Sequence, residues 1–179
     1  MNQRAANSLP GLSPLVAGGI VVGVLGLSAL IGRRNAPAPS HPRIRTWYRH
    51  LDKPGFTPPD AVFAAVWPVL ETGMAVGGYR LLRHAPSPRR NSSIGLWLAT
   101  SAMIGGWTEL FFRERALATS AAASGAMLAT TAAYVVTTQK VDRVAQATAL
   151  PLLGWLAFAT VLATRVWQRN PSPALPQCA

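Results

Sequence analysis

Residues 120–136 read SAAASGAMLATTAAYVV, and residues 149–162 read ALPLLGWLAFATVL. Neither stretch contains a charged side chain, and on a helix both would be apolar around their whole circumference. The surface helices of a soluble bundle need a polar face toward water. The two stretches therefore predict an all-α integral membrane protein in preference to a soluble bundle of five helices.

The charge of the chain is concentrated in a few places. Half of the 179 residues are apolar and only 13% are charged, yet the formal net charge is +11. The basic residues flank apolar runs in short clusters, whereas a soluble domain spreads its charges. They form no continuous basic surface, so nucleic-acid binding is not needed to explain them. The lipid bilayer is the partner that this pattern predicts.

Five apolar runs are long enough to cross the hydrocarbon core of a bilayer, which takes about 20 helical residues. The predicted spans are residues 12–31, 61–82, 93–112, 116–138 and 144–167. We expect one five-transmembrane-helix bundle over residues 1–179, with a flexible tail at 171–179. The first loop, third loop and C-terminal tail carry ten Lys and Arg residues, against seven elsewhere. This small bias favours a cytoplasmic first loop and C-terminus.

Small residues recur along the spans and allow helix backbones to approach closely. In the first span they are Gly18, Gly19, Gly23 and Gly26. We expect most of them to serve packing within the bundle. The best candidates for a homodimer interface are four small residues on one face of the third span, Gly95, Ala99, Ala102 and Gly106.

Residues 47–67, which read WYRHLDKPGFTPPDAVFAAVW, join the first two spans. Three prolines in this stretch fix φ and stiffen the backbone. Its aromatic side chains suit a boundary between water and lipid. We therefore expect residues 47–60 to form an ordered cap over the bundle.

The second span contains a proline beside a tryptophan. Pro68 removes a backbone hydrogen bond and is expected to bend the helix. One helical face there carries Trp67, Glu71, Met74 and Gly78, and we expect it to be a cavity wall. A buried Glu71 would be uncharged or paired, bonding either a ligand or a backbone carbonyl that Pro68 leaves free.

The fifth span repeats this arrangement. Pro151, Trp155, Phe158, Ala159 and Leu162 lie along one helical stripe. From spacing alone, the stripe either lines a cavity or faces lipid or neighbouring helices.

No catalytic residue, metal site or cofactor is predicted. His41, His50 and His84 lack metal-ligand spacing. No nucleophile–base pair, phosphate loop or dinucleotide motif occurs. Cys178 is the single cysteine, so an internal disulfide is excluded.

Several of these sequence patterns resemble those of a known family. The loop resembles that of the tryptophan-rich sensory protein or translocator protein family, which reads like WYxxLxKPxWxPPxxxFxxVWxxLY. The matching residues are Trp47, Tyr48, Leu51, Lys53, Pro54, Phe56, Pro58, Pro59, Phe63, Val66 and Trp67. The family's third-helix pattern NxxWxxxFFxxR is similar to the one formed here by Trp107, Phe111, Phe112 and Arg115. Its fifth-helix pattern PYxxWLAFAxxLNxxxWxxN is similar to residues 151–170. The resemblance covers residues 12–170 and is to a divergent, bacterial-type member.

Four positions depart from the family patterns, namely Glu71, Ile104, Leu152 and Ala163. The resemblance implies that these positions line the pocket, so ligand choice is expected to differ from that of relatives. Thr164 replaces the tyrosine of a sterol-binding pattern, which is weak in any case. Cholesterol binding is therefore not predicted.

The resemblance implies a five-helix bundle, commonly a homodimer, in a bacterial cell membrane, with a ligand pocket closed by the first loop. It implies a receptor or transport-type protein that binds porphyrins such as protoporphyrin IX and drug-like apolar ligands, linked to tetrapyrrole handling or stress signalling. One alternative is an enzyme that degrades porphyrin photo-oxidatively with its pocket tryptophans. Another is a structural partner protein without a ligand.

Physical chemistry is consistent with a porphyrin. A flat apolar macrocycle would stack on aromatic rings while its propionates met cationic side chains at the mouth of the pocket. The expected ligand-binding residues are Trp47, Arg49, Lys53, Pro54, Phe56, Trp67, Glu71, Trp107, Phe111, Trp155, Phe158, Ala159 and Leu162.

Overall fold

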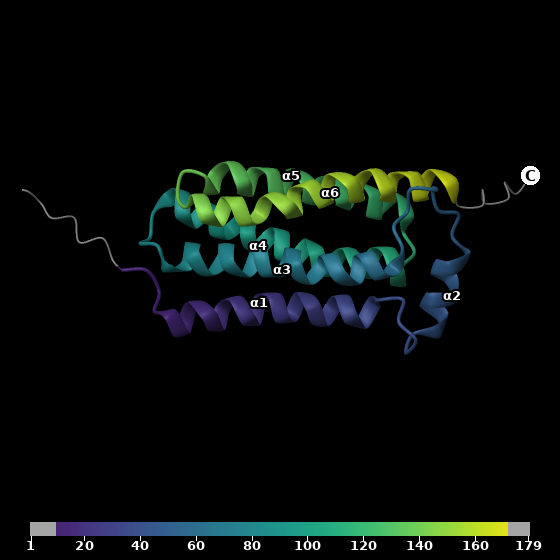
Figure 1. Cartoon of the computed structure of the whole chain (residues 1–179), viewed down its shortest axis with the longest axis horizontal. Coiled ribbons are helices and arrows are strands. Elements are labelled where there is room, and N and C mark those ends of the chain that lie inside the picture. The colour runs from purple at the N-terminus through teal and green to yellow at the C-terminus, as the bar shows by residue number, and fades with distance from the viewer. Residues whose placement is uncertain (1–9, 172–179) are drawn as a thin grey trace, which may run out of the picture.

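A computed structural model describes residues 10–171. All the regular secondary structure in this part of the chain is helical, and it contains no strand. Five long helices run side by side, and one short helix lies across one end of them (Figure 1). The long helices are α1 (Pro14–Asn35), α3 (Asp60–Arg83), α4 (Pro88–Thr108), α5 (Leu117–Thr138) and α6 (Arg143–Arg169). The short helix is α2 (Pro42–His50), and a five-residue π-helical turn, η1 (Glu109–Arg113), follows α4. Cys178 and residues 172–179 of the predicted tail lie outside the described residues.

Each predicted span falls on one long helix. By length and composition, α1, α3 and α6 can cross a membrane. The other two do not meet the same criterion: α4 begins with Arg89 and Arg90, and α5 is rich in serine and threonine. The all-helical membrane class is therefore supported by three helices, and the count of five spans stays a prediction.

The long helices form a closed ring. α1 packs against α3 and α4, α3 packs against α6, and α5 lies between α4 and α6. Side chains of the helix N-caps fix where several of these helices begin. Ser13, Ser87 and Asp142 accept hydrogen bonds from the backbone N–H groups of Val16, Arg90 and Ala145, which satisfies donors that the first helical turn leaves free.

The closest helix approaches are made by glycines of α3, not by those of α1. Gly73 and Gly77 lie against the backbone of α6, and a methyl group at either position would meet the carbonyl of Thr148 or the hydroxyl of Tyr134. Gly18, Gly19, Gly23 and Gly26 have no neighbour within 4 Å at the position of a Cβ atom. The expectation that the α1 glycines pack closely is therefore wrong.

Trp97 packs against part of the α3 face that was predicted to line a cavity. Its ring is 0% exposed, lies directly against Gly78, and donates a hydrogen bond from Nε1 to the Met74 carbonyl at 2.9 Å. Met74 and Gly78 therefore belong to the packed core between α3 and α4. The part of the same face nearest Pro68, with Trp67 and Glu71, is only half buried.

Asp142 ties together the end of the bundle opposite α2. Its side chain is 3% exposed and accepts hydrogen bonds from Arg80 Nε at 3.0 and 2.9 Å and from His84 Nε2 at 2.8 Å. Burial alone would raise the pKa of Asp142, but the bonds from Arg80, His84 and the Ala145 N–H outweigh it and hold that pKa well below 3.8. The start of α6 is thereby fixed to the end of α3.

We expect Asp142→Asn to lower the free energy of unfolding by about 2 kcal/mol, because an amide can cap α6 but cannot pair with Arg80. In the wild type this stabilisation is complete above pH 3.8, the ordinary pKa of the carboxyl, and is lost as pH falls through the lowered value in the folded protein. Thermal unfolding in detergent across this pH range measures both effects. Glu114→Gln, at an exposed acid, is the control, and equal losses in both variants would contradict the assignment.

Candidate ligand site beneath the first loop

The first half of the loop docks through aromatic rings on the end of α4. Trp47 meets Phe111 edge-on at 5.8 Å between ring centroids, and Tyr48 meets Phe112 at 5.6 Å. Trp107, one turn earlier, stacks on Phe111 at 4.8 Å. These five rings form what we call the α2–η1 aromatic cluster. Such pairs add about 0.5–1.5 kcal/mol each beyond the burial of their area, so the cluster holds α2 across the bundle.

The π-helical turn η1 places two of these rings. A π-turn widens the helix locally and changes the direction of the side chains that follow. Phe111 is 5% exposed and faces α2, although an uninterrupted helix was expected through residue 112. No residue pattern marked the turn in advance.

The second half of the loop contacts α6. Phe56 lies 6.3 Å from Phe158, and Phe63, in the first turn of α3, lies 5.6 Å from Trp155. Pro54 is buried at the base of the loop and accepts hydrogen bonds from the backbone N–H and the hydroxyl of Thr57, at 2.9 and 2.7 Å. The prolines and the turn thus hold Phe56 over the bundle, as an ordered cap requires.

An apolar groove of about 450 Å³ lies between α3 and α6. It is lined by Ala65, Val66, Val69, Leu70, Pro151, Gly154, Trp155 and Phe158. None of these side chains is charged, and the volume falls within the range of about 300–1,000 Å³ that is usual for small-molecule sites. We call it the α3–α6 groove. It suits a flat apolar ligand, with aromatic rings at one end for stacking.

The predicted ligand-binding residues do not all meet at one place. Trp155 and Phe158 line the α3–α6 groove, and Phe56 lies against its rim. Trp47, Trp107 and Phe111 belong to the α2–η1 aromatic cluster. Ala159 and Leu162 continue along α6 and are half buried, whereas Arg49 is exposed. The sequence did not single out Phe63 and Phe112 as site residues, although both stand within the aromatic patterns of the first loop and third span.

Trp67 and Glu71 lie on α3 outside the lining of the groove. Glu71 is half buried and makes no hydrogen bond within the described residues. Beside it, the Thr72 hydroxyl donates a hydrogen bond to the Pro68 carbonyl at 2.7 Å. The expected bond from Glu71 to a carbonyl freed by Pro68 is therefore not formed.

Lys53 points back onto the loop. Its Nζ lies 3.6 Å from the centroid of the Tyr48 ring, within the range of a cation–π contact. Burial, and then the negative charge of Asp60, raise the pKa of Tyr48 to about 12. Burial lowers the pKa of Lys53, partly offset by Asp60. Of the two cations predicted at the mouth, Lys53 is packed and Arg49 is exposed.

Asn170 fastens the loop to the end of α6. The Asp52 N–H donates to Asn170 Oδ1 at 3.0 Å, and Asn170 Nδ2 donates back to the Asp52 carbonyl at 2.9 Å. Arg169 adds an ion pair to the Asp52 carboxylate at 3.3 Å. The amide pairs with the loop backbone as a neighbouring strand would, so we call this contact the Asn170 latch. Asn170 matched the family pattern, but its partner is distant in sequence and could not be read from it.

We expect Asn170→Ala to loosen the first loop while leaving the bundle folded, because it removes both hydrogen bonds between the Asn170 amide and the loop, worth about 1 kcal/mol each. Trypsin cleavage after Arg49, followed by mass spectrometry, should accelerate roughly tenfold as loop opening becomes easier. Asn91→Ala removes an exposed amide at the other end of the bundle and should leave this rate unchanged. An unaltered rate in Asn170→Ala would show that the aromatic contacts hold the loop without the latch.

Comparison with known proteins shows which family the chain resembles. The model of the TspO/MBR family matches residues 19–168, which include α2, the cap and the α3–α6 groove. The chain is 33% identical to the translocator protein of Homo sapiens over 130 residues, covering 69% of this chain and 75% of that protein. It is 31% identical to the translocator protein of Ovis aries over 129 residues, with the same coverage. With three helices apolar and long enough to span a bilayer, the chain belongs to the TspO/MBR family of membrane proteins.

Proposed function

We propose that this protein is a membrane receptor of the transport type that binds porphyrin-like tetrapyrroles and flat drug-like ligands beneath its first loop. The observation that carries the proposal is the junction of the α3–α6 groove with the loop. There Phe56 and Phe63 meet Phe158 and Trp155 at 6.3 and 5.6 Å, so an apolar volume and an aromatic cap adjoin.

The chemistry of the groove favours a planar apolar ring. Its walls offer aliphatic side chains along α3 and the rings of Trp155 and Phe158 along α6, so a macrocycle would be desolvated and stacked at once. Lys53 and Arg49, in the loop above, are the cations available to propionates. Protoporphyrin IX combines these two features, a flat apolar ring and two carboxylates.

In this proposal all five long helices cross a bacterial cell membrane, with the first loop and the C-terminus in the cytoplasm. α4 and α5 have 21 and 22 residues, or roughly 30 Å of helix at 1.5 Å per residue, which matches the hydrocarbon core. Small residues on these two helices favour packing against neighbours over contact with lipid.

Titration of the detergent-solubilised protein with protoporphyrin IX should quench tryptophan fluorescence to saturation. Phe158→Ala should weaken binding about tenfold, because it removes a stacking ring and the area that the ring buries. Trp155→Phe should preserve affinity but reduce the amplitude of quenching, because it removes an indole from the groove.

The matched controls are Leu150→Ala, exposed on the same helix, and Trp167→Phe, exposed at the end of α6. Saturable binding that is indifferent to Phe158→Ala, or equally weakened by Leu150→Ala, would remove the groove as the site. Each titration is repeated in darkness and under light. A light-dependent loss of porphyrin absorbance that Trp155→Phe abolishes would favour the degrading enzyme instead.

We also propose that the protein forms homodimers through one face of α4. The small residues Gly95, Ala99, Ala102 and Gly106 are exposed, and no atom lies within 4 Å of the Cβ position at Gly95 or Gly106. Two such faces allow the close backbone contact that stabilises helix pairs in lipid. The proposal rests on this exposure together with the spacing.

Ala102→Trp should reduce chemical cross-linking of dimers in liposomes at least severalfold, because a large ring would keep the two α4 helices apart. Ala133→Trp, at an exposed alanine of α5, makes the same change on another face and should leave cross-linking unchanged. Dimers that persist in Ala102→Trp but disappear in Ala133→Trp would place the interface on α5.

A further inference from the structure

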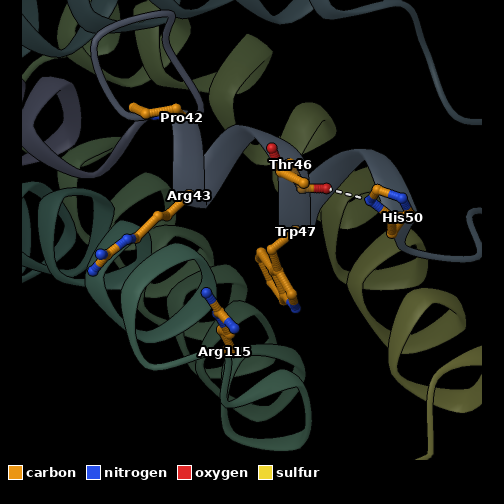
Figure 2. Close-up of a pocket in the computed structure, with 6 residues that line it drawn as sticks. All are labelled: Pro42, Arg43, Thr46, Trp47, His50 and Arg115. Atoms are coloured by element: carbon orange, nitrogen blue, oxygen red, sulfur yellow. Dashed lines mark hydrogen bonds between the residues drawn. The ribbon is translucent and has the colours of Figure 1, made fainter.

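A second hollow, distinct from the α3–α6 groove, lies between α2 and the corner that leads into α5 (Figure 2). Its volume is about 540 Å³, and it shares no lining residue with the groove. The lining residues are Pro42, Arg43, Thr46, Trp47, His50 and Arg115. We call it the arginine hollow. None of the functional roles argued above uses it.

The hollow presents two guanidinium groups without a counter-charge. Arg43 comes from the first turn of α2, and Arg115 from the corner before α5. Neither forms a salt bridge or side-chain hydrogen bond within residues 10–171, and no acidic residue lines the hollow. In Figure 2 both side chains extend to the same side of α2 as Trp47. Unpaired guanidinium groups are the donors that suit an oxyanion, because they make charge-assisted and often bidentate hydrogen bonds.

Arg115 is held in place by its backbone and by Trp47. Its φ of 55° lies in the left-handed region, which costs a non-glycine residue free energy and persists only where the surroundings enforce it. The Ala116 N–H bonds to the Leu110 carbonyl at 3.0 Å across the corner. The guanidinium carbon lies 5.4 Å from the centroid of the Trp47 ring, within cation–π range. Arg115 is thus positioned before any ligand arrives.

His50 lines the hollow, and its Nδ1 already has a hydrogen-bond partner. Nδ1 lies 2.7 Å from the Thr46 carbonyl, the contact drawn in Figure 2. A carbonyl only accepts, so Nδ1 carries the hydrogen. The ring is therefore fixed by α2 itself, and the guanidinium groups of Arg43 and Arg115 are the arginine donors that line the hollow.

We propose that the arginine hollow binds the phosphate group of an anionic phospholipid. The hollow is open and lies at the α2 end of the bundle, where the apolar helix α1 ends in Arg33 and Arg34 and α3 begins (Figure 1). This is the depth of lipid headgroups if these helices span the bilayer. Phosphate matches the guanidinium forks, and the ring of Trp47 and Pro42 offer apolar surface to the glycerol region.

Native mass spectrometry of the full chain in detergent, with added phosphatidylglycerol, tests this proposal. Wild type should retain one lipid molecule in preference to phosphatidylcholine. Arg43→Gln and Arg115→Gln should each weaken retention about tenfold, the loss expected for a charge-assisted hydrogen bond. Arg89→Gln and Arg143→Gln, at exposed arginines of the opposite end, are the controls and should behave as wild type.

Inorganic phosphate at millimolar concentration separates the two sources of the anion. Retention that it leaves unchanged supports the lipid, whereas displacement of the lipid by phosphate alone would assign the site to a soluble anion and overturn the proposal. Equal losses in all four variants would reduce the effect to net charge. Equal retention of phosphatidylcholine, whose phosphate is neutralised by choline, would contradict recognition of an anionic lipid. Arg43 is exposed on a surface helix, so Arg43→Gln tests the site even if Arg115→Gln fails to fold.

Discussion

The packing of Phe111 is the contact on which the loop end of the molecule depends. Four aromatic rings contact Phe111. They are Trp107 of α4, Trp47 and Tyr48 of α2, and Phe112 of η1. Phe111 occupies this place because the helix widens into a π-turn at Glu109. If the turn were regular, the side chains after it would rotate away, and α2 would lose the surface on which it docks. Both the cap over the α3–α6 groove and the arginine hollow require α2 in this position.

The two ends of the bundle are held by different forces. At the end opposite α2, the buried carboxylate of Asp142 is shared between Arg80 and His84 and also caps α6. Breaking such a set leaves a charge unpaired, so this end is expected to stay closed. At the loop end, aromatic edges and the Asn170 latch act instead. Each of these contacts contributes about 1 kcal/mol, so the cap can open without unfolding the helices. This difference between the two ends supports the loop end as the location of the proposed ligand site.

The pattern of apolar residues predicted where the helices lie, but not which residues of different helices contact one another. Apolar runs located all five long helices, because a helix that crosses the hydrocarbon core needs about 20 apolar residues in a row. The stripe of Trp155 and Phe158 was recognised from its helical spacing. Trp97 was missed as a core residue, because one apolar residue within an apolar run carries no signal about which helix it will meet. The latch and the carboxylate cluster join residues more than 50 positions apart, and the π-turn depends on packing that no local pattern encodes.

The positions where this chain departs from the family patterns take on a different meaning in the folded protein. Leu152 and Ala163 are buried in the bundle at 0% and 5% exposure, and neither they nor Glu71 and Ile104 line the α3–α6 groove. A tyrosine or an asparagine at the two buried positions would require a polar partner inside the bundle, whereas leucine and alanine require only close packing. These two departures therefore alter how α6 packs against its neighbours. In the proposed function, the choice of ligand depends instead on the residues that face the groove, above all Trp155 and Phe158, which the chain retains.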